Sequence, residues 1–127
     1  MNLIDAAKNG NIELVQELLD SGADINIQNR DGDTALIYAT MEEDTEMGRL
    51  LLDNGADPNI RDHEGENALI IAVSDSPHTE MVQLLLNKGA DPNIRDNGGF
   101  TPLIIASFRG YTKLVRLLLN KGADSTI

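Results

Sequence analysis

The sequence predicts an all-α solenoid in which helix-turn-helix units stack side by side and are joined by β-hairpin-like loops. The first observation is a Gly-Ala-Asp motif that begins at Gly22, Gly55, Gly89 and Gly122, at spacings of 33, 34 and 33 residues. The second is a leucine-rich segment before each motif, and the third is a polar, glycine-containing turn between units. A fixed period of this length indicates one unit that buries its apolar face only against its neighbours.

The third unit shows the order of elements. Residues 62–66 (Asp-His-Glu-Gly-Glu) predict a tight turn. Asn67 is expected to cap a short helix over residues 68–73, because its side-chain oxygen can accept hydrogen bonds from the first free amides. A second helix is expected over residues 79–88, and Gly89 ends it as a left-handed residue.

The same order recurs along the chain, so we expect one domain of four repeats. The first repeat lacks the preceding hairpin. The expected repeats are approximately 1–28, 29–61, 62–95 and 96–127. The expected caps of the first helices are Thr34, Asn67 and Thr101, and the small residues where helices approach closely are Ala39, Ala72 and Ala106.

Two motifs of the fourth unit identify the repeat: Thr-Pro-Leu-Ile-Ile-Ala at 101–106 and Leu-Leu-Asn-Lys-Gly-Ala-Asp at 118–124. They resemble the ankyrin repeat patterns Thr-Pro-Leu-His-x-Ala and Leu-Leu-x-x-Gly-Ala-Asp, and the resemblance covers the whole chain. The family's histidine is replaced by Ile37, Ile70 and Ile104. Apolar packing is therefore expected where the family has a polar link between neighbouring loops.

The connection between the two helices of a unit also departs from the family pattern. Its glycine is kept at Gly10 and Gly110 but is Glu43 in the second unit. In the third unit it is Ser76 with an inserted Pro77, which accounts for the 34-residue spacing. We expect this loop to differ locally without breaking the stack.

Composition restricts the possible functions. The 127 residues carry a net charge of −11 and contain no cysteine, which excludes disulfides and zinc thiolate sites. The negative charge disfavours nucleic acid and favours a basic protein partner, although it can also serve solubility alone. No signal peptide and no apolar run of about 20 residues is present, so we expect a cytoplasmic chain that does not bind membranes.

No cofactor, metal site or enzymatic activity is expected. His63 and His78 lie in different loops without a nucleophile beside them, and His78 occupies a position where the ankyrin pattern often has a structural histidine. The corner after each second helix repeats the same aspartates and asparagines, which are better explained by hydrogen bonds to nearby backbone than by a binding site. These corner residues are Asp24, Asp57, Asp91 and Asp124 with Asn26, Asn59 and Asn93. The acidic run at 42–44 with Glu46 lacks the ligand spacing of a calcium loop. A convergent set of acid, base and nucleophile is missing.

The two ends of the stack differ. Glu17 replaces the leucine found at Leu50, Leu84 and Leu117, as a solvent-facing cap requires. The fourth unit keeps apolar residues up to Leu119 without such a change. Either this outer side tolerates exposed apolar atoms, or it docks on a partner or on a second copy to form a weak homodimer.

The resemblance implies a protein-binding function. In ankyrin proteins the partner usually lies on the concave face formed by the hairpin tips and the first helices. The residues that this implies here are Arg30, Asp31, Asp33, Tyr38, Met41, Arg61, His63, Glu64, Glu66, Ser74, Arg95, Asn97, Phe100 and Phe108.

This strip grades from acidic to aromatic. Phe100 and Phe108 are the only phenylalanines, and exposed aromatics are frequent binding hot spots. The alternative is that Phe108 covers the end of its own repeat. A narrower expectation is an inhibitor or immunity-type protein that blocks a basic enzyme, and the alternative function is self-association through the fourth repeat.

Overall fold

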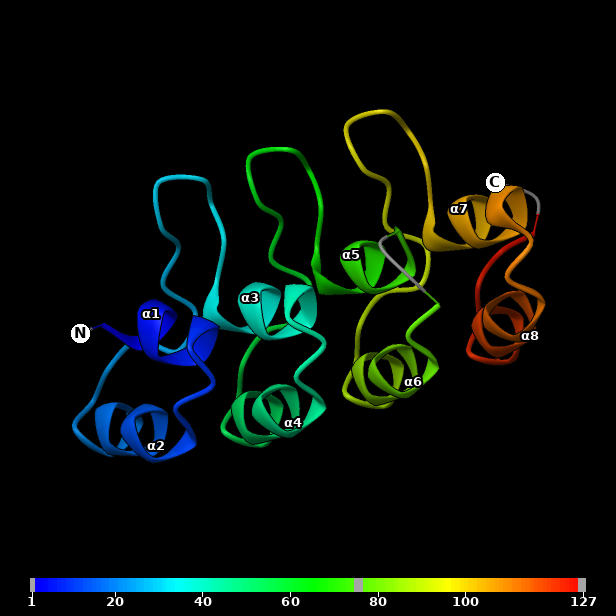
Figure 1. Ribbon diagram of the computed structural model, residues 1–127. Helices are drawn as coiled ribbons and strands as arrows, with labels where there is room; N and C mark the ends of the chain where they lie inside the picture. The colour runs from blue at the N-terminus through cyan, green and yellow to red at the C-terminus, as the bar shows by residue number, and fades with distance from the viewer. Residues whose placement is uncertain (1, 75–76, 126–127) are drawn as a thin grey trace.

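The computed structural model describes residues 2–74 and 77–125, and within these ranges all regular secondary structure is helical. The helices form two rows (Figure 1). We call the row on the side of the loops the inner helices and the other row the outer helices. The inner helices are α1 (Leu3–Lys8), α3 (Ala35–Met41), α5 (Ala68–Ser74) and α7 (Pro102–Arg109). The outer helices are α2 (Ile12–Asp20), α4 (Thr45–Asp53), α6 (Thr79–Asn87) and α8 (Thr112–Asn120).

Three loops project from the inner row toward the same side of the molecule (Figure 1). We call them the first finger (residues 28–34), the second finger (61–67) and the third finger (95–101). Each is closed by one backbone hydrogen bond across its base, such as Asp62 N to Glu66 O at 2.9 Å. The helical pairs and hairpin-like loops confirm the predicted solenoid.

Side-chain caps begin the inner helices at the predicted residues. The hydroxyl oxygens of Thr34 and Thr101 each accept a hydrogen bond from a backbone amide three residues later, at 3.2 Å. Asn67 Oδ1 accepts in the same way from the amide of Ile70 at 2.9 Å. Because short helices leave a large share of their amides unpaired, these caps are important for their stability.

The outer helices are capped in the same manner. The side chain of Asn11 accepts a hydrogen bond from the backbone amide of Leu14 in α2, and that of Asp44 accepts one from the amide of Met47 in α4. His78 Nδ1 takes this role for α6 and accepts from the amide of Met81 at 3.2 Å. His78 therefore has a structural function, as the sequence predicted.

The core is formed between repeats rather than within them. α1, α3, α5 and α7 pack in sequence, and α6 packs against α4 and α8. Ala39, Ala72 and Ala106 are buried where the inner helices approach closely, and Leu51 and Leu85 are fully buried in the outer row. Burial of one leucine contributes about 1.5–3 kcal/mol, so each repeat is stabilised by its neighbours.

The family's histidine position is apolar and buried inside the stack. Ile37 and Ile70 are 1% and 0% exposed, which confirms that apolar side chains pack there. Ile104, in the last repeat, is only half-buried. The difference shows that this position faces the following repeat.

The corner carboxylates have the local role that the sequence predicted. In each internal corner an aspartate side chain accepts a hydrogen bond from the backbone amide two residues later, as Asp57 Oδ1 does from Asn59 N at 2.9 Å.

The asparagine two residues after each of these aspartates makes a link between repeats that the sequence did not predict. Asn59 Oδ1 accepts from Asp91 N at 2.7 Å, and Asn59 Nδ2 donates to Gly89 O at 3.1 Å. Asn26 and Asn93 also bind the following corner, so the asparagines form a ladder along the stack.

The connections between paired helices contain a left-handed residue. Gly10 and Gly110 have φ values of 73° and 74°. Glu43, at the same position of the second repeat, has a φ of 55°, which L-residues with a Cβ adopt at a cost. The predicted departure at Ser76 lies outside the described residues.

We expect Glu43→Gly to be more stable than Glu43→Ala by about 1 kcal/mol, because both lose the carboxylate but only glycine relieves the left-handed strain. Urea unfolding followed by circular dichroism measures the difference. Equal stabilities of the two variants would show that the loop is not strained at this residue.

Candidate functional site

The three fingers stack on one another and form a continuous surface. His63 N donates to Asp31 O at 3.0 Å, which joins the second finger to the first. Gln28 Nε2 donates to Arg61 O at 3.0 Å, and Asn97 Nδ2 donates to His63 O at 3.4 Å. The polar links between loops are therefore made by other residues than the family's histidine. We call the exposed side of the fingers and of α3, α5 and α7 the finger face.

Most of the predicted finger residues are exposed on this face. Those with exposed side chains are Arg30, Asp31, Arg61, His63, Glu64, Arg95 and Asn97. Glu66 is half-buried at the base of the second finger. The structure thus brings these predicted residues together on one surface.

Asp33 is a correction to the predicted set. Its side chain is only 6% exposed, because the second finger packs against it, and it cannot serve as a free surface contact. Desolvation by burial raises the pKa of Asp33 to about 6, and a hydrogen bond with the Asp62 side chain acts in the same direction. The negative charges of Asp62, Asp31 and Glu64 raise this pKa further. Asp33 therefore belongs to the contact between fingers.

The predicted helix residues of α3 and α5 differ in their surroundings. Tyr38 is half-buried; its hydroxyl accepts from Asn29 Nδ2 at 3.1 Å, and Lys8 Nζ lies 5.5 Å from its ring centroid. The Ser74 hydroxyl donates to Ile70 O at 2.7 Å. Met41 is 39% exposed. Of these three, Met41 offers the largest free apolar surface.

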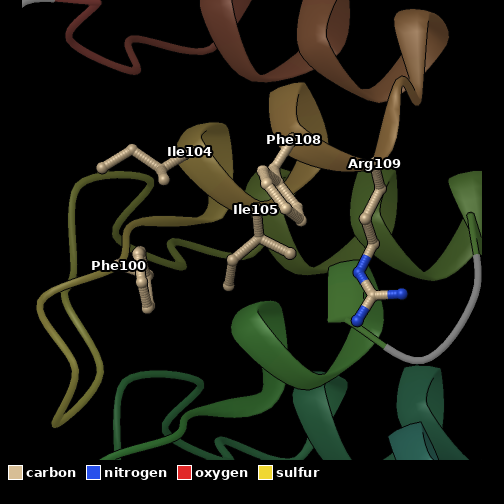
Figure 2. Close-up of a pocket in the computed structure, with 5 residues that line it drawn as sticks. All are labelled: Phe100, Ile104, Ile105, Phe108 and Arg109. Carbon is tan, nitrogen blue, oxygen red and sulfur yellow. The ribbon is translucent and has the colours of Figure 1, made fainter.

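An apolar cavity of about 240 Å³ lies where the third finger meets α7. Figure 2 shows Ile105 between Phe100 and Phe108, with Arg109 beyond Phe108. Phe100 is 51% exposed, and Phe108 is 92% exposed, so the Phe108 ring is almost uncovered by its own repeat. This exposure contradicts the alternative that Phe108 only covers the end of its repeat. The cavity is lined by Phe100, Ile104, Ile105, Phe108 and Arg109.

Ile105 and Arg109 were missed as site residues. Ile105 occupies the position of Tyr38 and Ile71 in the earlier repeats, and Tyr38 was included in the predicted strip. Comparison of equivalent positions along the repeats would have found it. Arg109 follows Phe108 directly and gives the apolar cavity a positively charged edge.

Charge is distributed unevenly along the stack. Residues 1–95 contain six basic and nineteen acidic side chains, a net charge of −13. Residues 96–127 contain four basic and two acidic side chains, a net charge of +2. On the finger face, the first two fingers contain two basic and five acidic side chains and are acidic. Of the four basic residues of 96–127, Arg109 lines the apolar cavity at α7, whereas Lys113 and Arg116 lie on α8 in the outer row.

The described residues include no group of three or more His, Asp or Glu side chains arranged to hold a metal ion. Within the same residues, no helix has the length and apolar character needed to cross a bilayer. The finger face offers charges and apolar surface, as protein-binding surfaces do.

A family model of ankyrin repeats (3 copies) matches the chain over residues 3–96 and 49–127. No curated protein matches this chain in sequence. Ankyrin repeats are generally non-enzymatic modules for protein–protein interaction. The match extends over nearly all of the chain, and the stacked helical pairs agree with it. This chain therefore belongs to the ankyrin repeat family.

Proposed function

We propose that the chain is a non-enzymatic module that binds a protein partner through the finger face. The observation that carries this proposal is Phe108, whose ring is 92% exposed at the edge of an apolar cavity. A large aromatic ring in water has an unfavourable environment, and it gains most when a partner covers it. Phe100 and Ile105 provide an apolar surface beside it for the same partner.

The charges beside the cavity indicate the chemistry of the partner. Asp31, Glu64 and the carboxylates near them favour basic side chains at the first two fingers, while the cavity accepts an apolar side chain. Arg109 favours an acidic group next to that apolar side chain. An interface of ordinary size covers about 800 Å² on each partner. We therefore propose a partner with a basic patch and a neighbouring apolar anchor.

A narrower proposal is that the partner is a basic enzyme whose substrate cleft the chain blocks, as an inhibitor or immunity-type protein does. The net charge of −11 supports it, because such a charge accelerates encounter with a basic surface. We expect association to slow by about tenfold or more between low and high salt. A complex whose association rate does not depend on salt would contradict this steering and leave the apolar anchor as the main contact.

We expect Phe108→Ala to weaken capture of the partner by about tenfold or more, because the substitution removes the exposed anchor. The experiment uses the tagged chain as bait in extract of its native cell and quantifies each captured protein. The free energy of unfolding should change by less than about 0.5 kcal/mol, since the ring is exposed.

Arg49→Ala is the matched control, because Arg49 is exposed on α4 in the outer row, away from the finger face. It should leave capture unchanged. Equal capture by Phe108→Ala and the unsubstituted chain would contradict the proposed anchor.

A second proposed function is self-association through the outer side of the fourth repeat. The observation that favours it is an open cavity of about 610 Å³ on that side, whose lining is mostly apolar. The residues that line it are Leu103, Ile104, Ser107, Phe108, Val115, Leu119 and Ser125. Leu119, which lines it, is 44% exposed, although the equivalent Leu52 and Leu86 are 7% and 9% exposed. We expect a weak association that light scattering over a dilution series detects.

A further inference from the structure

The two ends of the stack expose complementary sets of residues. On the outer side of the fourth repeat, Val115 is half-buried and Leu119 is 44% exposed. Their equivalents in the third repeat, Val82 and Leu86, are 0% and 9% exposed because the fourth repeat covers them. These positions therefore face the repeat that follows.

The first repeat exposes the opposite side of the same junction. Leu14 and Leu18 on α2 are half-buried. Their equivalents in the third repeat, Met81 and Leu85, are 1% and 0% exposed because they face the preceding repeat. Each end thus shows one half of the apolar surface that every internal junction buries.

The junction between the second and third repeats shows which side chains meet. A Cβ built on Gly48 would lie 3.2 Å from Met81 Sδ and 3.7 Å from Leu84 Cδ2. On the outer surface beside this contact, Arg49 of α4 lines a shallow cavity with residues of α6. The residues of α6 that line it are Thr79, Glu80, Gln83, Leu84 and Asn87.

The same junction formed between two copies would join opposite charges. Arg116 on α8 occupies the position of Arg49, since both are the fifth residue of their outer helix. On α2 of a second copy, the equivalents of Glu80, Leu84 and Asn87 are all carboxylates. These three residues are Glu13, Glu17 and Asp20.

We propose that the occupant of the outer side of the fourth repeat is the first repeat of a second copy, so that the chain associates head to tail. This proposal rests on the second proposed function and names its geometry. Val115 then packs on Leu14 as Gly48 packs on Met81, and Arg116 lies among three carboxylates. At each internal junction the equivalent outer helix offers fewer acidic residues to the preceding repeat.

Charge along the chain agrees with this orientation. Residues 96–127 carry a net charge of +2, and the remainder carries −13. At physiological ionic strength charges interact over about 8 Å, so the local attraction of the two ends outweighs the repulsion between distant acidic surfaces. A head-to-tail contact is heterologous, and each added copy leaves the same free end. The expected species are short linear oligomers whose mean length rises with concentration.

The test measures self-association of the full chain by sedimentation velocity over a dilution series at physiological ionic strength. We expect Arg116→Glu to weaken association by about tenfold or more, and Glu17→Lys to do the same at the other end. An equimolar mixture of the two variants should regain association, because each then offers the other a complementary end. Arg49→Glu is the matched control, since it makes the same charge change at the same helix position inside the stack.

The outcomes separate the two proposals. A chain that stays monomeric at millimolar concentration overturns both self-association and the head-to-tail contact. Association that Arg116→Glu weakens but Glu17→Lys leaves unchanged overturns only the head-to-tail contact and indicates that two fourth repeats meet. Circular dichroism of each variant checks that the fold is retained, and restoration by the mixture excludes misfolding as the cause of a loss.

Discussion

Gly32→Ala is expected to lower the free energy of unfolding by about 3 kcal/mol. Part of this loss comes from the left-handed backbone conformation at residue 32, and part from the collision of the added methyl group with the second finger. Gly32 has a φ of 82°, which disfavours any residue with a Cβ. A Cβ at this residue would also lie 2.8 Å from His63 N and 3.0 Å from Asp62 Cα in the second finger. These are backbone atoms, so they can move only if the finger moves. Urea unfolding followed by circular dichroism measures the loss.

Gly99→Ala is the matched control for this prediction. Gly99 is the equivalent residue of the third finger and has a φ of 85°, but a Cβ built there meets no described atom within 4 Å. Its substitution should cost only the backbone strain, about 1–2 kcal/mol. Equal losses for the two variants would mean that the fingers do not support one another.

Asp33→Asn is expected to raise the free energy of unfolding at pH 7 by about 1–3 kcal/mol. The pKa of the Asp33 carboxyl group is raised by about two units, which corresponds to roughly 3 kcal/mol of lost stability at pH 7. Relaxation of the structure around the asparagine makes the gain in stability smaller than this. The cause is the buried carboxyl group, whose pKa is raised to about 6 by burial and by the contact with Asp62. The folded protein binds this proton more tightly than the unfolded chain does. Asp33 therefore lowers stability progressively as the pH rises from about 4 to about 6, and its full cost is present above pH 6.

The measurement compares unfolding free energies at pH 4.5 and pH 7. Asp33→Asn should remove part of the loss that the unsubstituted chain shows over this interval, because asparagine does not titrate. Glu46→Gln is the control for net charge, since Glu46 is exposed on α4 and loses the same unit charge. An unchanged pH dependence in Asp33→Asn would show that this carboxyl group titrates as it does in the unfolded chain.

The stack could be predicted from the sequence because its signals are local and repeated. Caps such as Thr34 and Asn67, and left-handed glycines such as Gly89, act within a few residues of their own positions. The predicted helices at 68–73 and 79–88 agree with α5 and α6 to within one residue at each end. Repetition then fixes which helices are neighbours, without any distant contact having to be inferred.

Contacts between repeats were harder to predict. Asp33 is a charged residue in a polar turn, which predicts an exposed side chain, and only the packing of the second finger buries it. Asn59 was correctly placed in the corner, but its bonds to Asp91 and Gly89 depend on the rise between repeats, which the period does not give. The basic character of residues 96–127 was visible in the sequence, yet it has meaning only once the two ends are seen as complementary surfaces.

The most direct test of the proposed finger-face function is hydrogen–deuterium exchange of the chain alone and in complex with the captured partner. The proposal predicts that the partner slows exchange at the second and third fingers and over residues 102–109. Exchange in α2 and α4 should stay unchanged, because these outer helices lie on the other side of the inner row (Figure 1). Protection confined to the outer helices, with free exchange at the fingers and α7, would contradict binding through the finger face.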